Sequence, residues 1–181
     1  MTTKKTTPSW TDVKTTLEDF DHAGLVGLVQ DLYAASKDNQ TFLHTRFGLG
    51  GDALKPYKTI IERWLWPDLS NNLDTSITKA KKAIADYKKA IGQPQGLTEL
   101  MVFYCEQGAG FCNDIALQDE GYFDALVLMF EHTLKQLQNL PPEQRNAFGV
   151  RLVAACRLCR DLGYGVYDEV RDMLAEHGYT S

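Results

Sequence analysis

Residues 103–115 read FYCEQGAGFCNDI and lie within a longer apolar segment, residues 97–117. A helical wheel of 100° per residue brings many of its apolar side chains, together with one glycine, to one side. These residues are Leu97, Leu100, Met101, Tyr104, Gly108, Phe111 and Ile115. Val102, Phe103 and Leu117 lie on the opposite side, so the helix is apolar around most of its circumference. Such a pattern is typical of a helix at the centre of a fold, and it predicts that this one is buried.

Two glycines interrupt this segment. Gly108 falls within the apolar stripe, and Gly110 points toward the other side of the helix. Inside a helix, glycine is less favourable than alanine by about 1 kcal/mol. We therefore expect a packing reason for both, namely the close approach of another backbone at Gly108 and of a second neighbour at Gly110.

Amphipathic helices are indicated along most of the chain. Apolar side chains recur at helical spacing in residues 25–33, 57–65, 77–91, 123–137, 148–162 and 166–174. No segment shows the alternation of β-branched and polar residues that is typical of a strand. Since short turns join these helices, neighbours in sequence are expected to run antiparallel. The sequence predicts an all-α fold, an antiparallel helical bundle or a short stack of αα-hairpins, with about 7–9 helices and no sheet.

The length of 181 residues is that of one ordinary domain. Residues 1–8 are polar and predict a flexible tail, and residues 9–181 predict a single helical domain. Pro67 ends a helical stripe, so sub-units at residues 9–67 and 76–178 are one way in which this domain would divide. Ser9 and Asp12 have the spacing of a helix capping pair.

Composition and charge exclude several classes of protein. Hydrophobic residues make up 44% of the chain and charged residues 24%, which are globular values. The net charge of −5 argues against a general nucleic-acid binder, which would carry a basic surplus. The sequence contains no run of about 18 apolar residues that would span a membrane, and polar threonines stand where a signal peptide needs its apolar stretch. We therefore expect a cytoplasmic protein.

The spacing of the cysteines and of other potential ligands does not match a known metal or cofactor site. The four cysteines are Cys105, Cys112, Cys156 and Cys159. Cys105 and Cys112 would lie about 10 Å apart on a continuous helix, too far apart for one tetrahedral zinc ion. We expect free, buried thiols, no metal site and no cofactor. The motifs of common hydrolases and metalloenzymes are absent from the sequence, so no catalytic residue is assigned.

Glu106 and Asn113 are the candidates for a polar pocket. They are seven residues apart and share one face of the central helix, with Tyr104 and Asp114 nearby. If this face is covered, both side chains need hydrogen-bond partners. One interpretation is a binding pocket between helices, and the other is a structural network or a solvent-exposed edge.

Two further surfaces are candidates for an interface. Trp66 falls off the apolar stripe of its helix and lies near Arg63, a combination that is common in interface anchors. Lys79, Lys82 and Lys89 belong to the only basic patch in this acidic chain. They would attract an acidic or phosphate-rich partner, or form the solvated face of a surface helix.

Residues in the second half of the chain resemble a family of small all-helical bacterial proteins, a domain of unknown function. The resemblance spans about residues 20–178. It rests on Tyr104, Glu106, Gln107, Gly108, Phe111, Asn113, Tyr122, Phe123, Gly163, Gly165 and Asp168. It implies an all-helical fold and a bacterial cytoplasmic setting, and it implies no catalytic residue.

Three functional hypotheses follow. The first is a non-enzymatic module that binds another protein through a groove or through the edge at Trp66. The second is an inhibitor similar to immunity proteins or antitoxins, in which an acidic chain covers a basic partner. The third is an enzyme or small-molecule binder that uses a polar pocket around Glu106 and Asn113.

Overall fold

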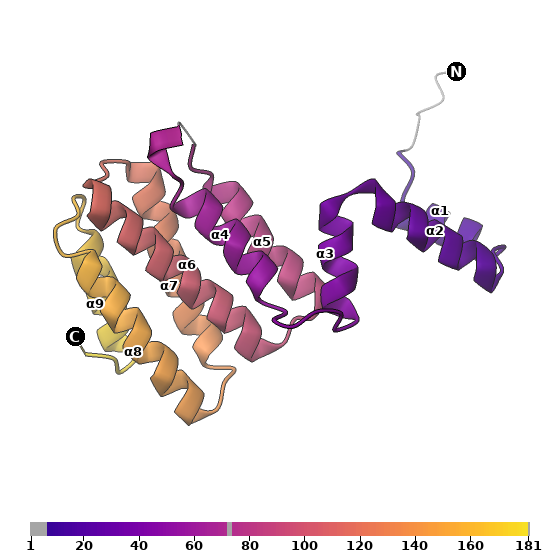
Figure 1. The fold of residues 1–181 in the computed structure, drawn as a ribbon. Coiled ribbons are helices and arrows are strands. Elements are labelled where there is room, and N and C mark those ends of the chain that lie inside the picture. Colours follow the sequence, from indigo (N-terminus) through magenta and orange to yellow (C-terminus); the bar gives the residue numbers. More distant parts are fainter. Residues whose placement is uncertain (1–6, 72–73, 181) are drawn as a thin grey trace, which may run out of the picture. The chain divides into compact units, whose positions relative to one another are not determined.

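The computed structural model describes residues 7–71 and 74–180. Within these ranges the chain forms nine α-helices and one short 3-10 helix, with no strand (Figure 1). The helices are α1 (Trp10–Leu17), α2 (His22–Ala35), α3 (Lys37–Arg46), α4 (Lys55–Leu65), η1 (Leu69–Asn71), α5 (Ile77–Ala90), α6 (Pro94–Ile115), α7 (Glu120–Leu137), α8 (Pro142–Leu158) and α9 (Val166–Glu176). The prediction of an all-α fold with about 7–9 helices is confirmed.

The chain divides into two compact units, residues 1–44 and 45–181. The first contains α1, α2 and most of α3, and the second contains α4–α9. The boundary between these units differs from the one suggested by the sequence, which offered residues 9–67 and 76–178 as possible sub-units of a single domain over residues 9–181. Pro67 ends α4 without separating it from the helices that follow, because α4 packs against both α5 and α6. The flexible tail predicted for residues 1–8 lies mostly outside the described residues.

Helix α6 is the centre of the second unit. It contacts α4, α5, α7 and α8, while α9 packs on α7 and α8. Figure 1 shows α6 running between the pair α4–α5 on one side and the pair α8–α9 on the other. Most of α6 between Leu97 and Cys112 is buried, and Phe111 and Tyr104 are among the largest fully buried side chains. The predicted central, buried helix is confirmed.

Local sequence explains how several helices begin and end. Pro94 occupies the first turn of α6, where its missing N–H leaves no hydrogen bond unmade. The helix ends at Ala116, whose backbone is left-handed with φ 48°. Asp119 then caps α7 by accepting a 2.9 Å hydrogen bond from the backbone N–H of Tyr122. At the start of α1, the Asp12 carboxylate accepts a 2.7 Å hydrogen bond from the backbone N–H of Ser9, as the spacing predicted.

Gly108 and Gly110 of α6 lie against side chains of other segments, so the prediction of a crossing backbone at Gly108 is wrong. A Cβ at Gly108 would lie 3.0 Å from Cδ1 of Leu126 on α7. A Cβ at Gly110 would lie 2.4 Å from the ring of Trp66. The side chains of Leu126 and Trp66 fill the space above these glycines. They leave no room for a larger residue, as a crossing backbone would also do.

All four cysteines are free and buried, as predicted. Burial raises the pKa of the Cys112 and Cys159 thiols to about 12, so both are neutral at physiological pH. Residues 7–71 and 74–180 contain no cluster of three or more potential metal-binding side chains. Over the same ranges, none of the helices combines the length and apolar character needed to cross a lipid bilayer.

Candidate functional site and interaction surfaces

The four candidates for a polar pocket do not meet in one place. Tyr104 is part of the core and only 1% exposed, and its pKa is raised, chiefly by burial. Asn113 is exposed to solvent. Glu106 faces α8, where it pairs with Arg151, and Asp114 lines a cavity near Trp66. Although Glu106 and Asn113 share a helical face, Glu106 is paired with Arg151, whereas Asn113 is exposed to solvent.

Glu106 belongs to an ion-pair network that joins three helices. Arg151 on α8 donates from Nε to Oε1 of Glu106 at 2.7 Å and from Nη2 to Oε2 at 2.8 Å. Its Nη1 also donates to Oε2 of Glu99 at 2.5 Å. Lys58 on α4 completes the network with a 2.5 Å contact to Oε1 of Glu99. Two cations thus neutralise two carboxylates, and the network connects α4, α6 and α8.

The electrostatics of this network favour a structural role. Burial raises the pKa of Glu99, but the hydrogen bonds from Arg151 and Lys58 outweigh burial and leave the pKa below its usual range. The pKa of Arg151 is raised, first by its hydrogen bonds to Glu106. The charged forms of Glu99 and Arg151 are therefore stabilised by their partners. A general acid or base needs the opposite, a pKa that is brought toward the working pH.

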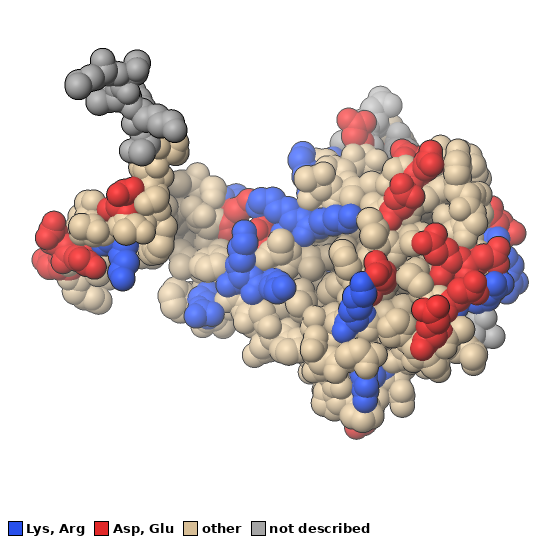
Figure 2. Space-filling model, turned by 180° about the vertical axis from the view of Figure 1, so that it is seen from behind, with Lys and Arg blue, Asp and Glu red and all other residues tan. Residues whose placement is uncertain are grey.

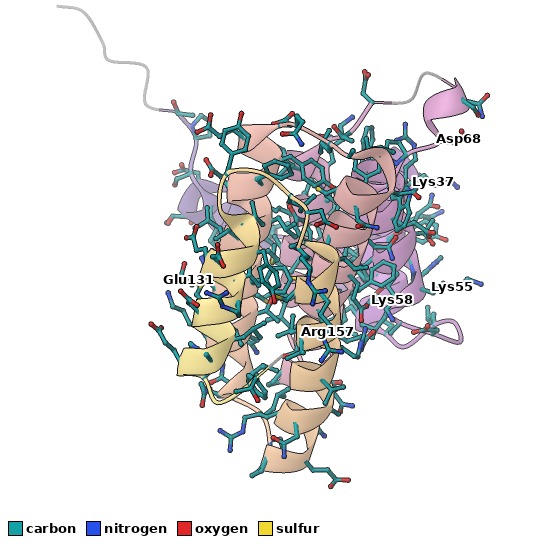
Figure 3. All side chains as sticks on the ribbon, turned by 90° about the vertical axis from the view of Figure 1, so that its left-hand side faces the viewer. Lys37, Lys55, Lys58, Asp68, Glu131 and Arg157 are labelled. Atoms are coloured by element: carbon teal, nitrogen blue, oxygen red, sulfur yellow. The ribbon has the colours of Figure 1, made fainter. Side chains whose placement is uncertain are left out.

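A cavity of about 410 Å³ lies beside Trp66, which is 39% exposed. The lining side chains are those of Trp66, Pro67, Asp68, Ser70, Phe111, Asp114 and Ile115. Hydrogen bonds from Ser70 and Asn71 lower the pKa of Asp68, so its carboxylate is charged at neutral pH. Figure 3 shows Asp68 beyond the end of α4 and Lys58 lower on the same edge, so the cavity and the ion-pair network lie at different ends of α4.

The surroundings of Trp66 differ from the pairing with Arg63 that the sequence suggested. Asp114, a candidate for the polar pocket, shares the cavity with Trp66. Arg63 instead stacks on Trp64, with its guanidinium carbon 4.3 Å from the ring centroid, and donates to the backbone carbonyl of Asp74 at 3.4 Å. The surface at this edge therefore combines an aromatic ring with carboxylates, and Arg63 stacks on Trp64 instead of Trp66.

The lysines that the sequence singled out on α5 differ in their contacts. Lys79 lies over Trp64, 3.7 Å from the ring centroid, and Lys82 pairs with Asp86 at 2.6 Å. Lys89 is exposed. Two other lysines of the same helix, Lys81 and Lys88, line a groove between α5, α6 and α7. The helical wheel of α5 does not distinguish Lys81 and Lys88 from the other lysines of this helix, because the opposite wall of the groove is formed by residues far away in the sequence.

The apolar stripe of α2 is exposed. Helix α2 contains no buried residue. The exposed side chains of its stripe are Leu25, Val26, Val29, Leu32 and Tyr33, and between 37% and 53% of each is accessible. These residues fall within about 120° of the helical wheel, so they form one continuous strip. We call this strip the α2 face. The sequence predicted the amphipathic helix but gave no indication that its apolar side is uncovered.

Comparisons with protein-family models, with curated proteins and with solved structures give no match to this chain. Function is therefore inferred from the contacts, burial and charges of the described residues.

Proposed function

We propose that this protein is a non-enzymatic helical module that binds another protein through the α2 face. The observation that carries the proposal is the exposure of five large apolar side chains along one helix. Single apolar residues are common on protein surfaces, whereas a contiguous apolar strip marks an interaction site. A helix with this pattern binds by laying its apolar side against a complementary partner surface.

An enzyme or small-molecule binder centred on Glu106 and Asn113 has less support. Arg151 occupies both carboxylate oxygens of Glu106, and Asn113 is exposed to solvent. For these residues to act together on a substrate, the ion pair would first have to open.

An acidic inhibitor of a basic partner is the second candidate. The Trp66 cavity favours it, because Asp68 and Asp114 stand beside an accessible aromatic ring. Carboxylates and an aromatic face together suit a lysine or arginine side chain. A gene for a basic, toxin-like protein next to the gene for this chain would support this function, and a surrounding metabolic operon would contradict it.

The test of the proposed function is affinity capture with a matched set of full-length variants. Val29→Glu together with Leu32→Glu places two charges at the centre of the α2 face. Val150→Glu, at an isolated exposed valine of α8, is the control. We expect a partner to be captured equally by the parent and by the control, and at least tenfold less by the double variant. Circular dichroism should show the same helix content for all three, because none of these side chains is buried.

Capture of the same proteins by all three variants, or repeated capture of none, would contradict the proposal.

A further inference from the structure

A second surface lies in the other unit, in a groove between α5, α6 and α7. The groove has a volume of about 480 Å³. Its apolar floor is formed by Ile84, Leu97, Met101 and Met129, each 5–8% exposed. These side chains belong to the core of the unit, so the groove opens the edge of the core to solvent. Methionine side chains are flexible and adapt to differently shaped apolar partners.

Basic side chains border this floor on both walls. Lys81 and Lys88 come from α5, and His132 and Lys135 come from α7. Lys135 forms an ion pair with Glu131. Lys81 and Lys88 form no ion pair or side-chain hydrogen bond with any residue in the described ranges. Figure 2 shows the face that carries α5 and α7, with basic side chains gathered toward α5 and acidic ones toward the opposite side.

The spacing of the two unpaired lysines indicates the shape of the ligand. Lys81 and Lys88 are seven residues apart, which separates them by about 10 Å along α5 and places them on the same side of that helix. A helix lying along the groove would match them with carboxylates that are also seven residues apart, beside an apolar stripe. A single fatty acid would supply only one carboxylate for the two lysines.

We propose that this groove binds an acidic amphipathic helix of another protein. The apolar stripe of that helix covers Met101 and Met129, and its carboxylates pair with Lys81 and Lys88. This site shares no residue with the α2 face, so the variants in the groove replace no side chain of α2. The two proposals therefore fail or succeed independently.

The test uses the full chain, labelled with ¹³C at the methionine methyl groups, and three synthetic peptides. The first is an 18-residue leucine-rich amphipathic helix with glutamates seven residues apart beside its apolar stripe. The second and third carry glutamine or lysine at those positions. We expect the glutamate peptide to shift the methyl signals of Met101 and Met129 and to leave Met173 on α9 unchanged. The glutamine peptide should bind at least tenfold more weakly by fluorescence anisotropy, and the lysine peptide more weakly still.

Matched variants test the role of charge. Lys81→Ser with Lys88→Ser should weaken the glutamate peptide at least tenfold and leave the affinity of the glutamine peptide unchanged. Lys55→Ser with Lys89→Ser removes the same charge at exposed lysines outside the groove and should have little effect.

Four results would overturn the proposal. The first two are methyl signals of Met101 and Met129 that do not change with the glutamate peptide, and equal affinities for the glutamate and glutamine peptides. The third is a change of these signals with dodecanoate but not with peptide. The fourth is a change of these signals when only the concentration of the protein is raised. The last two would identify the occupant as a fatty acid or a second copy of this chain.

Discussion

Gly110 lies directly under the ring of Trp66, and this contact makes it the more demanding of the two central glycines. An added methyl group would lie 2.4 Å from a ring carbon, and the rigid ring moves only as a whole. We expect Gly110→Ala to lower the free energy of unfolding by about 1–3 kcal/mol, the usual cost of overpacking. A thermal melt followed by circular dichroism measures this as a loss of several degrees.

Two other glycines supply the comparison. Gly108→Ala should cost less than Gly110→Ala, because the methyl group of Leu126 that it meets at 3.0 Å belongs to a flexible side chain. Gly121→Ala in α7 meets only an Asp119 oxygen at 3.4 Å, so it should be close to neutral. An equal melting temperature for Gly110→Ala and the parent would show that Trp66 does not pack as described.

Ala116 has a backbone conformation that glycine would adopt more easily than alanine. Its left-handed conformation, with φ 48°, ends α6. This conformation costs a non-glycine residue about 1–2 kcal/mol, and glycine tolerates it freely. We therefore expect Ala116→Gly to raise the free energy of unfolding by up to about 1 kcal/mol in denaturant titrations, since the greater freedom of glycine in the unfolded chain offsets part of the gain.

Tyr164 provides a contrast to Ala116, because it has φ 58° but also contacts Phe123, with ring centroids 5.8 Å apart. Tyr164→Gly should gain less than Ala116→Gly or lose stability. A clear loss for Ala116→Gly would argue against the strained helix end.

At the scale of elements, Glu99 connects α6 to both α4 and α8. Glu99→Gln removes the charge that Lys58 and Arg151 share, and we expect it to lower the free energy of unfolding by about 1–3 kcal/mol near pH 7. Because the pKa of Glu99 is lowered in the folded protein, its contribution is present above the unfolded value near 4.5. The contribution is lost as the pH falls through the folded pKa. Urea titrations from pH 7 to pH 3 should show the parent and the variant converging.

Glu131→Gln is the matched control for Glu99→Gln. It removes an ion pair with Lys135 within one helix at the surface, so it should have a much smaller effect. If the two variants behave alike at all pH values, the three-helix network contributes no more than a surface pair.

A comparison of the helices shows which features of burial can be predicted from local sequence. The periodicity of α6 predicted its burial, because apolar residues around most of a helix leave no side for solvent. The stripes of α2 and α4 look alike in sequence, yet α4 buries Tyr57, Ile61 and Leu65 while the α2 face is exposed. Periodicity identifies the apolar side of a helix but not what covers it.

For the candidate sites, too, local sequence indicates which residue needs a partner but not which distant residue supplies it. Glu106 was recognised as a residue that needs a partner, but Arg151, 45 residues later, was not identified as that partner. The groove was missed because its walls come from α5 and α7, which are separated along the chain by the whole of α6.

At the scale of the whole molecule, buried ionisable groups predict a loss of stability in alkali. Burial raises the pKa of Cys112 and Cys159 from a reference of 9.0 to about 12. A group with a raised pKa contributes its full stability below the unfolded pKa, and this contribution is lost as the pH rises toward the folded value. We expect the melting temperature to fall between pH 9 and pH 12. Replacing Cys112 with alanine should reduce the slope of that decline, whatever it does to stability at pH 7, and an unchanged slope would show that this thiol ionises without penalty.

The position of α6, with four helices packed around it, has a consequence for exchange of backbone hydrogen with heavy water. An amide exchanges only when its hydrogen bond opens to solvent, and regions with few buried contacts open at low cost. Amides in the middle of α6 have to wait for the whole second unit to unfold, so their exchange rates report its global stability. Helices α1 and α2 contain no buried residue, so we expect their amides to exchange through local opening. We therefore expect slow amide exchange in α6 and fast amide exchange in α1 and α2. A partner bound to the α2 face would slow exchange in α2 and leave the rates in α6 unchanged.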